Sequence, residues 1–295
     1  MNAQMFSLEH KVALVTGASR GIGEAIALAY AQAGADVALA ARSTDALEAT
    51  AARIRAMGRE AVAVTCDVTS TEQVRSCVDH VLKEFGRIDV LVNNAGGPKF
   101  NASFLATREE GWDKVIDLNL SSVLRFCQLV GAHMVSRGSG SVVNVSSVAT
   151  FRSSPGVAAY AAAKAAVASL TQTLAQEWAR SGVRVNTVSP GWINTEINRR
   201  LMESEVAAST IRGDVPMGRW GETDDLVGVA VWLASAASSY VTGANIPVDG
   251  GLAVAGAKGW RGLGIERTSR QGRAHAPELP PRLAPPHEAQ TDVSC

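Results

Sequence analysis

Short apolar runs alternate with longer segments of helical spacing, and this alternation constrains the fold more than any other feature of the chain. Runs of Val, Ile, Leu and Ala without polar alternation are typical of strands that are buried on both faces. Strands that alternate with helices form a parallel sheet covered by helices on both sides. We therefore predict strands at residues 11–15, 37–41, 61–65, 89–92, 141–145, 183–188 and 244–248. The helices expected between them span residues 23–34, 44–57, 71–85, 112–137 and 158–181.

These segments predict an α/β fold, a single doubly wound Rossmann-type domain with a parallel sheet of about seven strands and helices on both faces. The domain is expected to cover residues 8–255, after a flexible N-terminus at residues 1–7. The composition then changes, because residues 256–295 hold five of the ten prolines and six Lys or Arg residues but few large apolar ones. That composition predicts a disordered tail.

Composition and charge exclude several classes of function. The 295 residues carry 28 Lys plus Arg and 28 Asp plus Glu, so no net charge attracts nucleic acid or an anionic membrane. Residues 1–10 lack the apolar stretch of a secretory signal. The uncharged stretch 226–248 is interrupted by Ser, Thr, Gly, Asn and Pro, which favours a buried helix, a turn and a strand over a membrane span. Four cysteines without paired spacing argue against a disulfide framework or a metal site and fit the cytoplasm.

A glycine-rich segment, residues 16–23 (TGASRGIG), joins the first expected strand to the first helix. Glycines at such a turn let backbone N–H groups approach a pyrophosphate, and the helix N-terminus adds partial positive charge. Such turns also occur for packing alone, so it is the place of this one in an alternating α/β pattern that favours nucleotide binding. The residues expected to face a cofactor here are Gly17, Ser19, Arg20, Gly21, Ile22 and Gly23.

Tyr160 and Lys164 are four residues apart in an expected helix, so their side chains share one face. A phenol with a pKa of ~10 is a poor acid or base at neutral pH, and a nearby ammonium is expected to lower that pKa. The pair therefore suits proton transfer to or from a carbonyl oxygen. The spacing is also typical of a helical pair with its lysine in water. The Ala-rich helix and the preceding Ser146 and Ser147 favour catalysis, and neither serine lies in the Gly-x-Ser-x-Gly turn of a hydrolase.

The order and spacing of these motifs resemble the short-chain dehydrogenase/reductase family over about residues 8–253. Gly-x-x-x-Gly-x-Gly is followed by Asn-Asn-Ala-Gly at 93–96, then Asn119, Ser147, Tyr160, Lys164 and Pro-Gly at 190–191. The resemblance implies that Ser147, Tyr160 and Lys164 are catalytic, with Asn119 in a proton relay. The family serine lies thirteen residues before the tyrosine, which selects Ser147 over Ser146. Further cofactor contacts are implied for Asp67, Val68, Asn93, Ala95, Gly96, Tyr160, Lys164, Pro190, Ile193 and Thr195.

Two of the implied site residues have structural alternatives. Asn119 could be a buried amide bonded to backbone, which is compatible with holding a relay water. Asp67 could cap the following helix, a common role for an aspartate near Thr69 and Thr71.

The choice of cofactor depends on charge at the end of the second expected strand. An acidic residue there would bind a ribose 2′-hydroxyl, but Ala41 occupies the position and Arg42 follows it. Arg20, in the glycine loop, supplies a second guanidinium that would pair with a 2′-phosphate. The alternative is that both are solvated surface arginines. Their coincidence at two family positions beside the adenosine ribose predicts NADP(H).

No motif identifies the substrate beyond its class, which this interpretation predicts to be a small carbonyl compound or alcohol. Phe151 and Trp192 indicate a partly hydrophobic substrate site, and residues 194–215 fit either a mobile lid or a fixed helix pair. The chain is most similar in appearance to 3-oxoacyl-carrier-protein reductases, with sugar or polyol dehydrogenases as the alternative. A carrier-borne substrate would need a basic dock, for which Arg137 and Arg180 are candidates. The resemblance also implies a homo-oligomer, a homotetramer or a dimer. A non-catalytic NADP(H)-binding regulatory protein is the alternative of another class.

Overall fold

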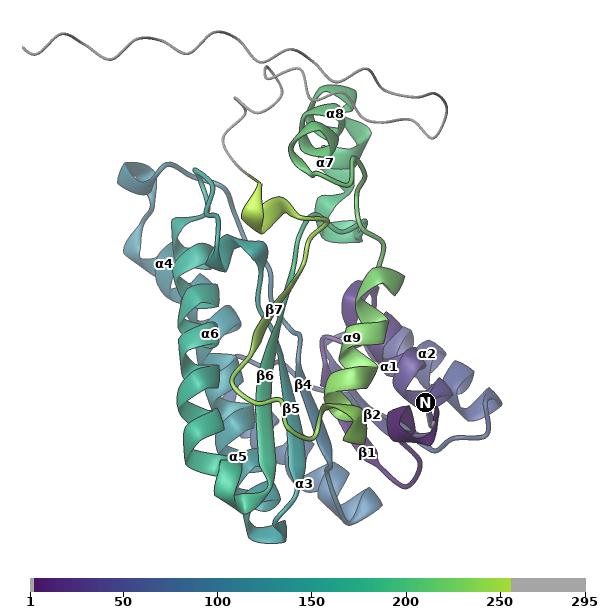
Figure 1. Cartoon of the computed structure of the whole chain (residues 1–295). Helices are drawn as coiled ribbons and strands as arrows, with labels where there is room; N and C mark the ends of the chain where they lie inside the picture. The colour runs from purple at the N-terminus through teal and green to yellow at the C-terminus, as the bar shows by residue number, and fades with distance from the viewer. Residues whose placement is uncertain (1–2, 256–295) are drawn as a thin grey trace, which may run out of the picture. The chain divides into compact units, whose positions relative to one another are not determined.

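The structure, a computed structural model, describes residues 3–255. Within these residues, seven parallel strands form one sheet in the order β3-β2-β1-β4-β5-β6-β7 (Figure 1). The strands are β1 (Val12–Thr16), β2 (Asp36–Ala41), β3 (Ala61–Thr65), β4 (Val90–Asn93), β5 (Gly140–Val145), β6 (Val183–Pro190) and β7 (Asn245–Val248). The predicted α/β class and the parallel seven-stranded sheet are confirmed.

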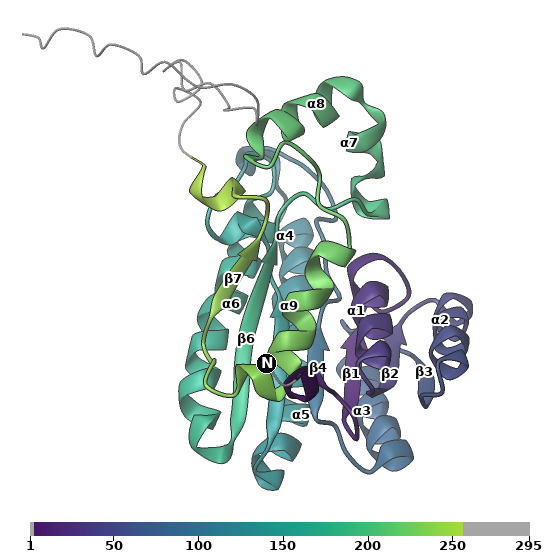
Figure 2. The ribbon, with the colours of Figure 1, turned by 45° about the vertical axis from the view of Figure 1, so that its right-hand side comes forward.

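Helices cover both faces of the sheet, as the two views in Figures 1 and 2 show. One face carries α1 (Gly21–Gln32), α2 (Thr44–Ala56) and α9 (Asp224–Ala234). The other carries α3 (Thr71–Phe85), α4 (Glu109–Ile116), α5 (Ser122–Arg137) and α6 (Ala158–Trp178). Two short helices, α7 (Arg199–Glu203) and α8 (Glu205–Asp214), stand beyond the carboxyl ends of the strands. Each set of covering helices encloses its own buried cluster, so the sheet separates two cores.

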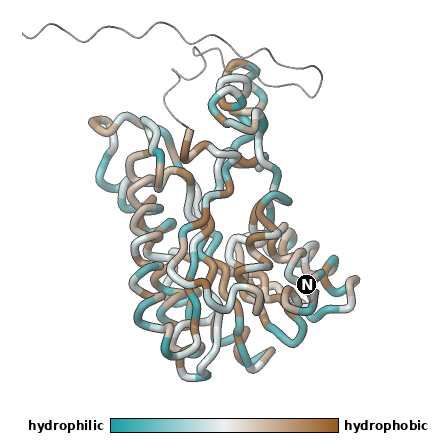
Figure 3. Tube along the Cα trace, in the orientation of Figure 1, coloured by the Kyte–Doolittle hydropathy of each residue, from teal (hydrophilic) through white to brown (hydrophobic). Residues whose placement is uncertain are grey.

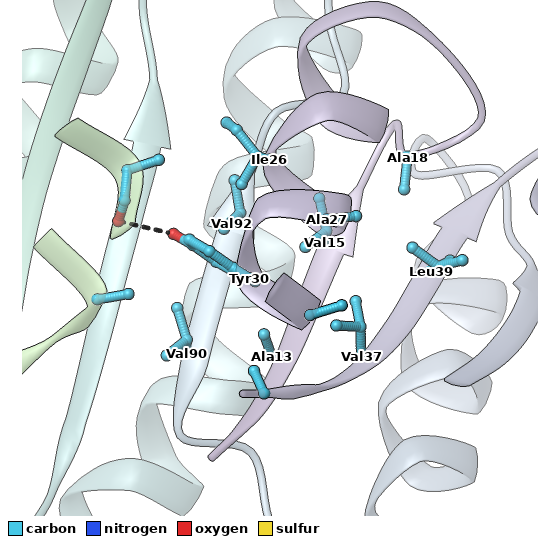
Figure 4. Close-up of a cluster of buried hydrophobic side chains, with 14 of the residues drawn as sticks. Ala13, Val15, Ala18, Ile26, Ala27, Tyr30, Val37, Leu39, Val90 and Val92 are labelled. Carbon is cyan, nitrogen blue, oxygen red and sulfur yellow. Dashed lines mark hydrogen bonds between the residues drawn. The ribbon is translucent and has the colours of Figure 1, made fainter. Parts of the chain in front are cut away.

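Tyr30 lies within the core on the α1 face (Figure 4), among side chains from β1, β2 and β4. Its hydroxyl donates a hydrogen bond of 3.1 Å to the carbonyl oxygen of Ala230 in α9. Burial raises the pKa of Tyr30 above its usual value, while the charge of Arg184 acts in the opposite direction. The phenol is therefore a neutral donor that joins two helices 200 residues apart in the chain.

On the other face, the stretch Glu109–Arg137 is long and apolar enough to cross a membrane by length and composition, the one such helix among the described residues. It comprises α4, a π turn (Asp117–Ser121) and α5. Phe126, Val130 and Met134 of α5 are buried in the core against the sheet. The apolar composition of α5 is therefore used in packing. Figure 3 shows the same trend more widely, with hydrophobic residues along the strands and hydrophilic ones in outer loops.

Most boundaries lie within a few residues of the predicted ranges, and three features of the structure were not predicted. β6 continues to Pro190 because its last residue still pairs with Val248 of β7. The helix predicted at 112–137 contains the π turn, in which the Ser122 N–H bonds the Asp117 carbonyl oxygen five residues earlier. A 3-10 helix, η1 (Ala3–Phe6), forms in the segment expected to be flexible. The expected tail, residues 256–295, lies outside the described residues.

Candidate active site

The predicted site residues lie beyond the carboxyl ends of the strands. The chain runs from β1 to β2 and β3 on one side of the sheet, and from β4 to β7 on the other. β1 and β4 are therefore neighbours at the point where the strand order reverses. In open α/β sheets such a switch point is where a crevice forms and ligands bind. The glycine loop follows β1, directly at this point.

The glycine loop is shaped by a side chain that sequence reasoning quoted in a motif but did not assign. The Asn94 amide donates to the carbonyl oxygens of Thr16, at 3.0 Å, and Gly17, at 3.2 Å. A Cβ on Gly23 would lie 2.3 Å from Gly17 O and 2.4 Å from Asn94 Nδ2. Gly17 itself has a positive φ of 65°, which favours glycine. The loop is thus closed to side chains and open to backbone approach, which fits a pyrophosphate above the first turn of α1.

Ser19, Gly21 and Ile22 lie where the loop enters α1, next to the cofactor residues predicted after β6. Gly21 and Ile22 form the first turn of the helix, and Ser19 is half-buried in the turn before it. A Cβ on Gly21 would lie 3.5 Å from Cγ2 of Thr195. Thr195 follows β6, so the structure brings two predicted cofactor segments together.

The predicted NADP(H) arginines are both solvent-exposed. Arg20 precedes α1 in the N-cap position, and Arg42 follows the last residue of β2. The carboxylate of Asp67, after β3, accepts hydrogen bonds from the N–H and hydroxyl of Thr69. These bonds lower the pKa of Asp67; burial opposes them, and the positive charge of Arg42 adds to the lowering. Asp67 does not cap α3, because Ser70 takes that position.

Asn93 and Val68 turn their side chains into the interior. The Asn93 amide donates to Asn144 Oδ1 at 2.8 Å and to Cys127 Sγ at 3.4 Å. Its own Oδ1 is buried and has no hydrogen-bond partner among the described residues. Val68 is also buried in the core beneath α3 and α5. Any contact that these two residues make with a cofactor in the crevice would come from backbone atoms.

The predicted catalytic pair stands over the end of β5. Tyr160 and Lys164 lie in the first two turns of α6, and the ammonium is 5.8 Å from the centre of the phenol ring. Lys164 is 3% exposed and donates to the Val145 carbonyl oxygen at 2.8 Å. The Ser147 side chain lies beside the Tyr160 hydroxyl, near enough to act on its pKa. The serine, the phenol and the ammonium are thus gathered at the carboxyl end of one strand.

The pKa of Tyr160 moves in the direction opposite to the prediction. Burial raises it above 10, and the hydrogen bond with Ser147 lowers it less than burial raises it. Burial also lowers the pKa of Lys164 to about 8. The sequence showed the spacing of the pair but not the depth at which the fold buries it, and in this structure desolvation dominates both pKa shifts. Tyr160 is therefore protonated at neutral pH.

The structure also separates the two serines. Ser146 Oγ donates to the Lys164 carbonyl oxygen at 2.8 Å and lies 2.9 Å from Thr150 Oγ1, so its hydroxyl is engaged inside the fold. Ser147 Oγ accepts the Ala149 N–H at 3.1 Å and is half-buried. The hydroxyl of Ser147 is the one that reaches Tyr160.

Asn119 sits in the π turn between α4 and α5, a feature that no helical spacing in the sequence revealed. Its Oδ1 accepts the Gly97 N–H at 2.8 Å, and its Nδ2 donates to the carbonyl oxygens of Gly97 and Val115. A Cβ on Gly96 would lie 2.7 Å from Asn119 Oδ1 and 3.1 Å from Lys164 Nζ. Asn119 thus holds the 96–97 backbone against the lysine. Turns of this type are frequent at functional sites.

The segment after β6 holds the last predicted cofactor residues beyond the carboxyl edge of the sheet. Pro190 ends β6, and Ile193 is buried and pairs with Gly221 in an isolated bridge. Trp192 meets Trp220 edge to face, with ring centres 5.7 Å apart. Phe151, which follows Ser147 by four residues, is 46% exposed. Within the residues described, no group of three His, Cys, Asp or Glu side chains could hold a metal ion.

A family model described as Enoyl-(Acyl carrier protein) reductase matches residues 17–253, from the glycine loop to the end of the fold. Relatives about 40% identical span nearly their whole length on this chain. The chain belongs to the short-chain dehydrogenase/reductase family. The resemblance found in its motifs is thereby confirmed, and with it the class of enzyme, an oxidoreductase acting on CH–OH groups.

Relatives of this short-chain dehydrogenase/reductase carry two kinds of name. A 2-dehydro-3-deoxy-D-gluconate 5-dehydrogenase from Pseudoalteromonas atlantica is 42% identical, covering 84% of this chain and 98% of its own. A 3-oxoacyl-(acyl-carrier-protein) reductase from Thermotoga maritima is 41% identical, with 84% and 99% covered. The crystal structure of a gluconate 5-dehydrogenase from Burkholderia cenocepacia, in complex with NADP and tartrate, is 38% identical with a TM-score of 0.82, with 85% and 98% covered.

Two arginines considered for carrier docking lie away from the site in this short-chain dehydrogenase/reductase. Arg137 ends α5 and contacts the buried carboxylate of Asp89 at 3.3 Å, next to the start of β4. Arg180 lies in η5 (Ala179–Ser181), just before β6 begins. Both are at the amino edge of the sheet, whereas the candidate site is at the carboxyl edge. They do not form a basic rim around this site within one chain.

Proposed function

We propose that the chain is an NADP(H)-dependent oxidoreductase that interconverts a carbonyl and a secondary alcohol, with Ser147, Tyr160 and Lys164 as its catalytic residues. One observation carries the proposal. The Ser147 and Tyr160 side chains lie together over the buried Lys164, beyond the same sheet edge as the glycine loop. A carbonyl oxygen placed between two such hydroxyls would receive two hydrogen bonds and a proton.

Tyr160 is suited to act as the acid in the reduction direction. Burial keeps its phenol protonated at neutral pH, so a proton is available for the substrate oxygen. Ser147 would bind the same oxygen and stabilise the charge that develops on it. NADPH supplies the hydride for the carbonyl carbon when it is bound. Lys164 would favour the phenolate that is left, and Asn119 would hold the backbone of residues 96–97 in place for proton return.

The glycine loop and two arginines support NADP(H) as the cofactor. A Cβ at Gly23 would fill the space beside Gly17 O, so the loop has the form of a backbone cradle. Arg20 and Arg42 flank the expected adenosine end, and no acidic residue ends β2. A relative of 38% identity was crystallised with NADP. Asp67, Val68, Asn93, Ala95, Gly96, Pro190, Ile193 and Thr195 are proposed to complete the cofactor site, Val68 and Asn93 through backbone atoms.

Two substrate classes have support. The exposed Phe151 and Ile197 give the site an apolar rim, which suits a 3-oxoacyl thioester; Phe151 and Trp192 would line the substrate. A pocket of about 400 Å³ beside Thr195, lined mostly by polar and charged residues, suits a hydroxylated keto acid instead. Its lining residues are Asn194, Thr195, Glu196, Arg199, Met202 and Glu203. The placement of Arg137 and Arg180 away from the site weakens a carrier-borne substrate.

The test measures NADPH consumption against a panel of carbonyl substrates. The panel contains an acetoacetyl thioester, keto sugar acids, a diketone and a 2-enoyl thioester, the last because of the description of the family model. We expect turnover with at least one carbonyl and none with the enoyl thioester, which lacks an oxygen at the reacting carbon. NADPH binding without turnover of any compound would favour the non-catalytic regulatory alternative. Turnover of the enoyl thioester alone would contradict the proposed reaction.

We further propose a homo-oligomeric, cytoplasmic enzyme, a dimer or tetramer. The outer face of α6 exposes small side chains, including Ala162, Ala165 and Ser169, which permit another helix to approach closely. Cys66, Cys77 and Cys127 are buried and unbridged, as is usual in a reducing compartment. Light scattering of the purified full chain tests the assembly, and a monomeric mass at micromolar concentration would contradict it.

A further inference from the structure

Arg125, one turn into α5, contacts three separate segments with one guanidinium group. Its Nε donates to Thr71 Oγ1 at 3.0 Å, at the start of α3. Its Nη1 donates to the Val68 carbonyl oxygen at 3.4 Å, in the loop after β3. Its Nη2 donates to Asp117 Oδ1 at 2.6 Å, in the first residue of the π turn. The Arg125 side chain is 20% exposed and that of Asp117 is 35% exposed, so the contacts are partly shielded from water.

The ion pair with Asp117 is not an ordinary helical pair. Side chains three or four residues apart are neighbours on an α-helix, whereas Asp117 and Arg125 are eight apart. Eight residues correspond to a rise of about 12 Å in an α-helix. The pair therefore spans the π turn, in which the Ser122 N–H is bonded to Asp117 O. Because Arg125 is bonded to Asp117, the first residue of the turn, it stabilises the turn in its π conformation.

The turn held in this way carries Asn119 against the site. Asn119 makes two hydrogen bonds with the backbone of Gly97, and Gly96 faces the Lys164 ammonium. The Val68 contact lies in the loop after β3, where Asp67 and Val68 are predicted to contact the cofactor. Arg125 is thus connected to this loop and to the π turn through hydrogen bonds and a salt bridge.

We propose that Arg125 is a positioning residue shared by the loop after β3 and the π turn carrying Asn119, so that one guanidinium holds the loop after β3 through one set of contacts and the turn beside Lys164 through another. The proposal rests on the proposed function for its catalytic consequence, but its structural part concerns this chain alone. Arg125 touches neither substrate nor reacting atoms in it. A lysine cannot replace the guanidinium, because one ammonium does not reach three acceptors in a fixed fork.

The contacts of Arg125 with the π turn and with the start of α3 can be removed by separate substitutions. Arg125→Met keeps the aliphatic part of the side chain and removes every polar contact. Asp117→Ala removes the contact with the π turn, and Thr71→Ala removes the contact with the start of α3, directly after the loop that follows β3. We expect Asp117→Ala to lower kcat about tenfold with the NADPH Kd within about twofold, since small misplacements of reacting groups are costly. Thr71→Ala should raise the NADPH Kd several-fold at unchanged kcat. Arg125→Met should do both, and Arg125→Lys should not rescue it.

Amide hydrogen exchange of the ligand-free protein supplies a readout independent of turnover. Peptides covering residues 66–71 and 117–122 should exchange at least about tenfold faster in Arg125→Met, at matched thermal midpoint, than in wild type. The control is Arg75→Met, at an exposed position of α3, which should change neither kinetics nor exchange. If the wild type reduces no carbonyl, the proposed function fails, and exchange still decides whether Arg125 holds both segments. Unchanged exchange in both peptides, or equal changes in kcat and Kd for Asp117→Ala and Thr71→Ala, would overturn the proposal.

Discussion

Ser146 and Ser147 are adjacent and chemically identical, yet the fold gives them different partners. Ser146 is bonded to the α6 backbone and Thr150, whereas Ser147 faces the Tyr160 hydroxyl. Extended backbone at the end of a strand turns successive side chains to opposite sides, so one serine enters the core and the other enters the site. A sequence motif alone could choose between them only through the fixed spacing to the tyrosine.

Removing the Tyr160 hydroxyl is the most direct test at the level of a residue. Tyr160→Phe should lower kcat by about 10²- to 10⁴-fold, because the proton donor is lost while the ring still fills its place. The NADPH Kd, measured by fluorescence titration, should stay within about twofold. Tyr240→Phe is the matched control, since Tyr240 is fully exposed, and it should leave both values unchanged. A Tyr160→Phe enzyme with wild-type kcat would refute its role as acid.

Cofactor preference is expected to depend on Arg42. Arg42→Asp should lower the ratio of kcat/KM for NADPH to that for NADH at least about tenfold. The reason is that a hydrogen bond to a charged group contributes ~1.5–3 kcal/mol of binding free energy. The carboxylate would also repel a 2′-phosphate. Arg180→Asp makes the same charge change at the far edge of the sheet and should leave the ratio unaltered. An unchanged ratio in Arg42→Asp would remove the charge argument for NADP(H).

Among the elements, the glycine loop depends on a neighbour that the sequence does not place. Its own residues explain the positive φ of Gly17, but the need for glycine at position 23 comes both from Gly17 O and from Asn94, which lies 71 residues later in the chain. The π turn is similar, since the apolar spacing of residues 109–137 continues through it without interruption. Strand and helix positions were predictable because burial on two faces shapes local composition. Contacts between segments that are distant in the chain were not predictable, because they form only once the sheet is assembled.

Substitution at Gly23 tests the cradle. Gly23→Ala should weaken NADPH binding at least about tenfold, because the new Cβ would meet Gly17 O at 2.3 Å and the loop would have to open. Isothermal titration of folded protein measures the change. Gly228→Ala is the control: this glycine lies in α9 with open space around its Cβ position, and the change should stabilise the helix by ~0.5–1 kcal/mol without altering binding. Should Gly23→Ala bind NADPH normally, the loop is not the pyrophosphate site.

For the whole molecule, stability at low pH is tied to Asp89 at the amino edge of the sheet. Its carboxylate accepts two bonds from Arg87 and one from the Val12 N–H. Burial acts to raise the pKa of Asp89, but these bonds outweigh it and the pKa lies below the usual range. The carboxylate therefore stabilises the fold above the unfolded-state pKa of ~3.9, and this contribution is lost as pH falls through the lower folded-state value.

The matching variant is Asp89→Asn. Urea unfolding at pH 7 should show a loss of ~1–3 kcal/mol, because charged hydrogen bonds to a buried acceptor are removed. The difference from wild type should shrink as the pH is lowered below about 4, where the wild-type carboxylate takes up a proton as well. Asp79→Asn, on an exposed turn of α3, should show no such convergence. A difference that stays constant down to pH 2 would show that Asp89 acts without its charge.

The class of the molecule was readable from its sequence because every short-range signal agreed with the final sheet. The substrate was not readable, since the exposed apolar side chains nearest to the predicted site residues in the chain, Phe151 after β5 and Ile197 before α7, belong to segments far apart in the sequence. The pKa of Tyr160 was predicted in the wrong direction for the same reason. Its burial is a property of the closed fold and cannot be deduced from a spacing of four residues.

The bond from Tyr30 to Ala230 has a consequence for how the chain is made. The helix that begins at the glycine loop leaves the ribosome early, but its partner is synthesised 200 residues later. At about 5–20 residues per second, the apolar side of that first helix waits roughly 10–40 s for its cover. Nascent chains are therefore exposed to aggregation or to chaperones on one side of the sheet, and a translational pause before α9 would lengthen that window.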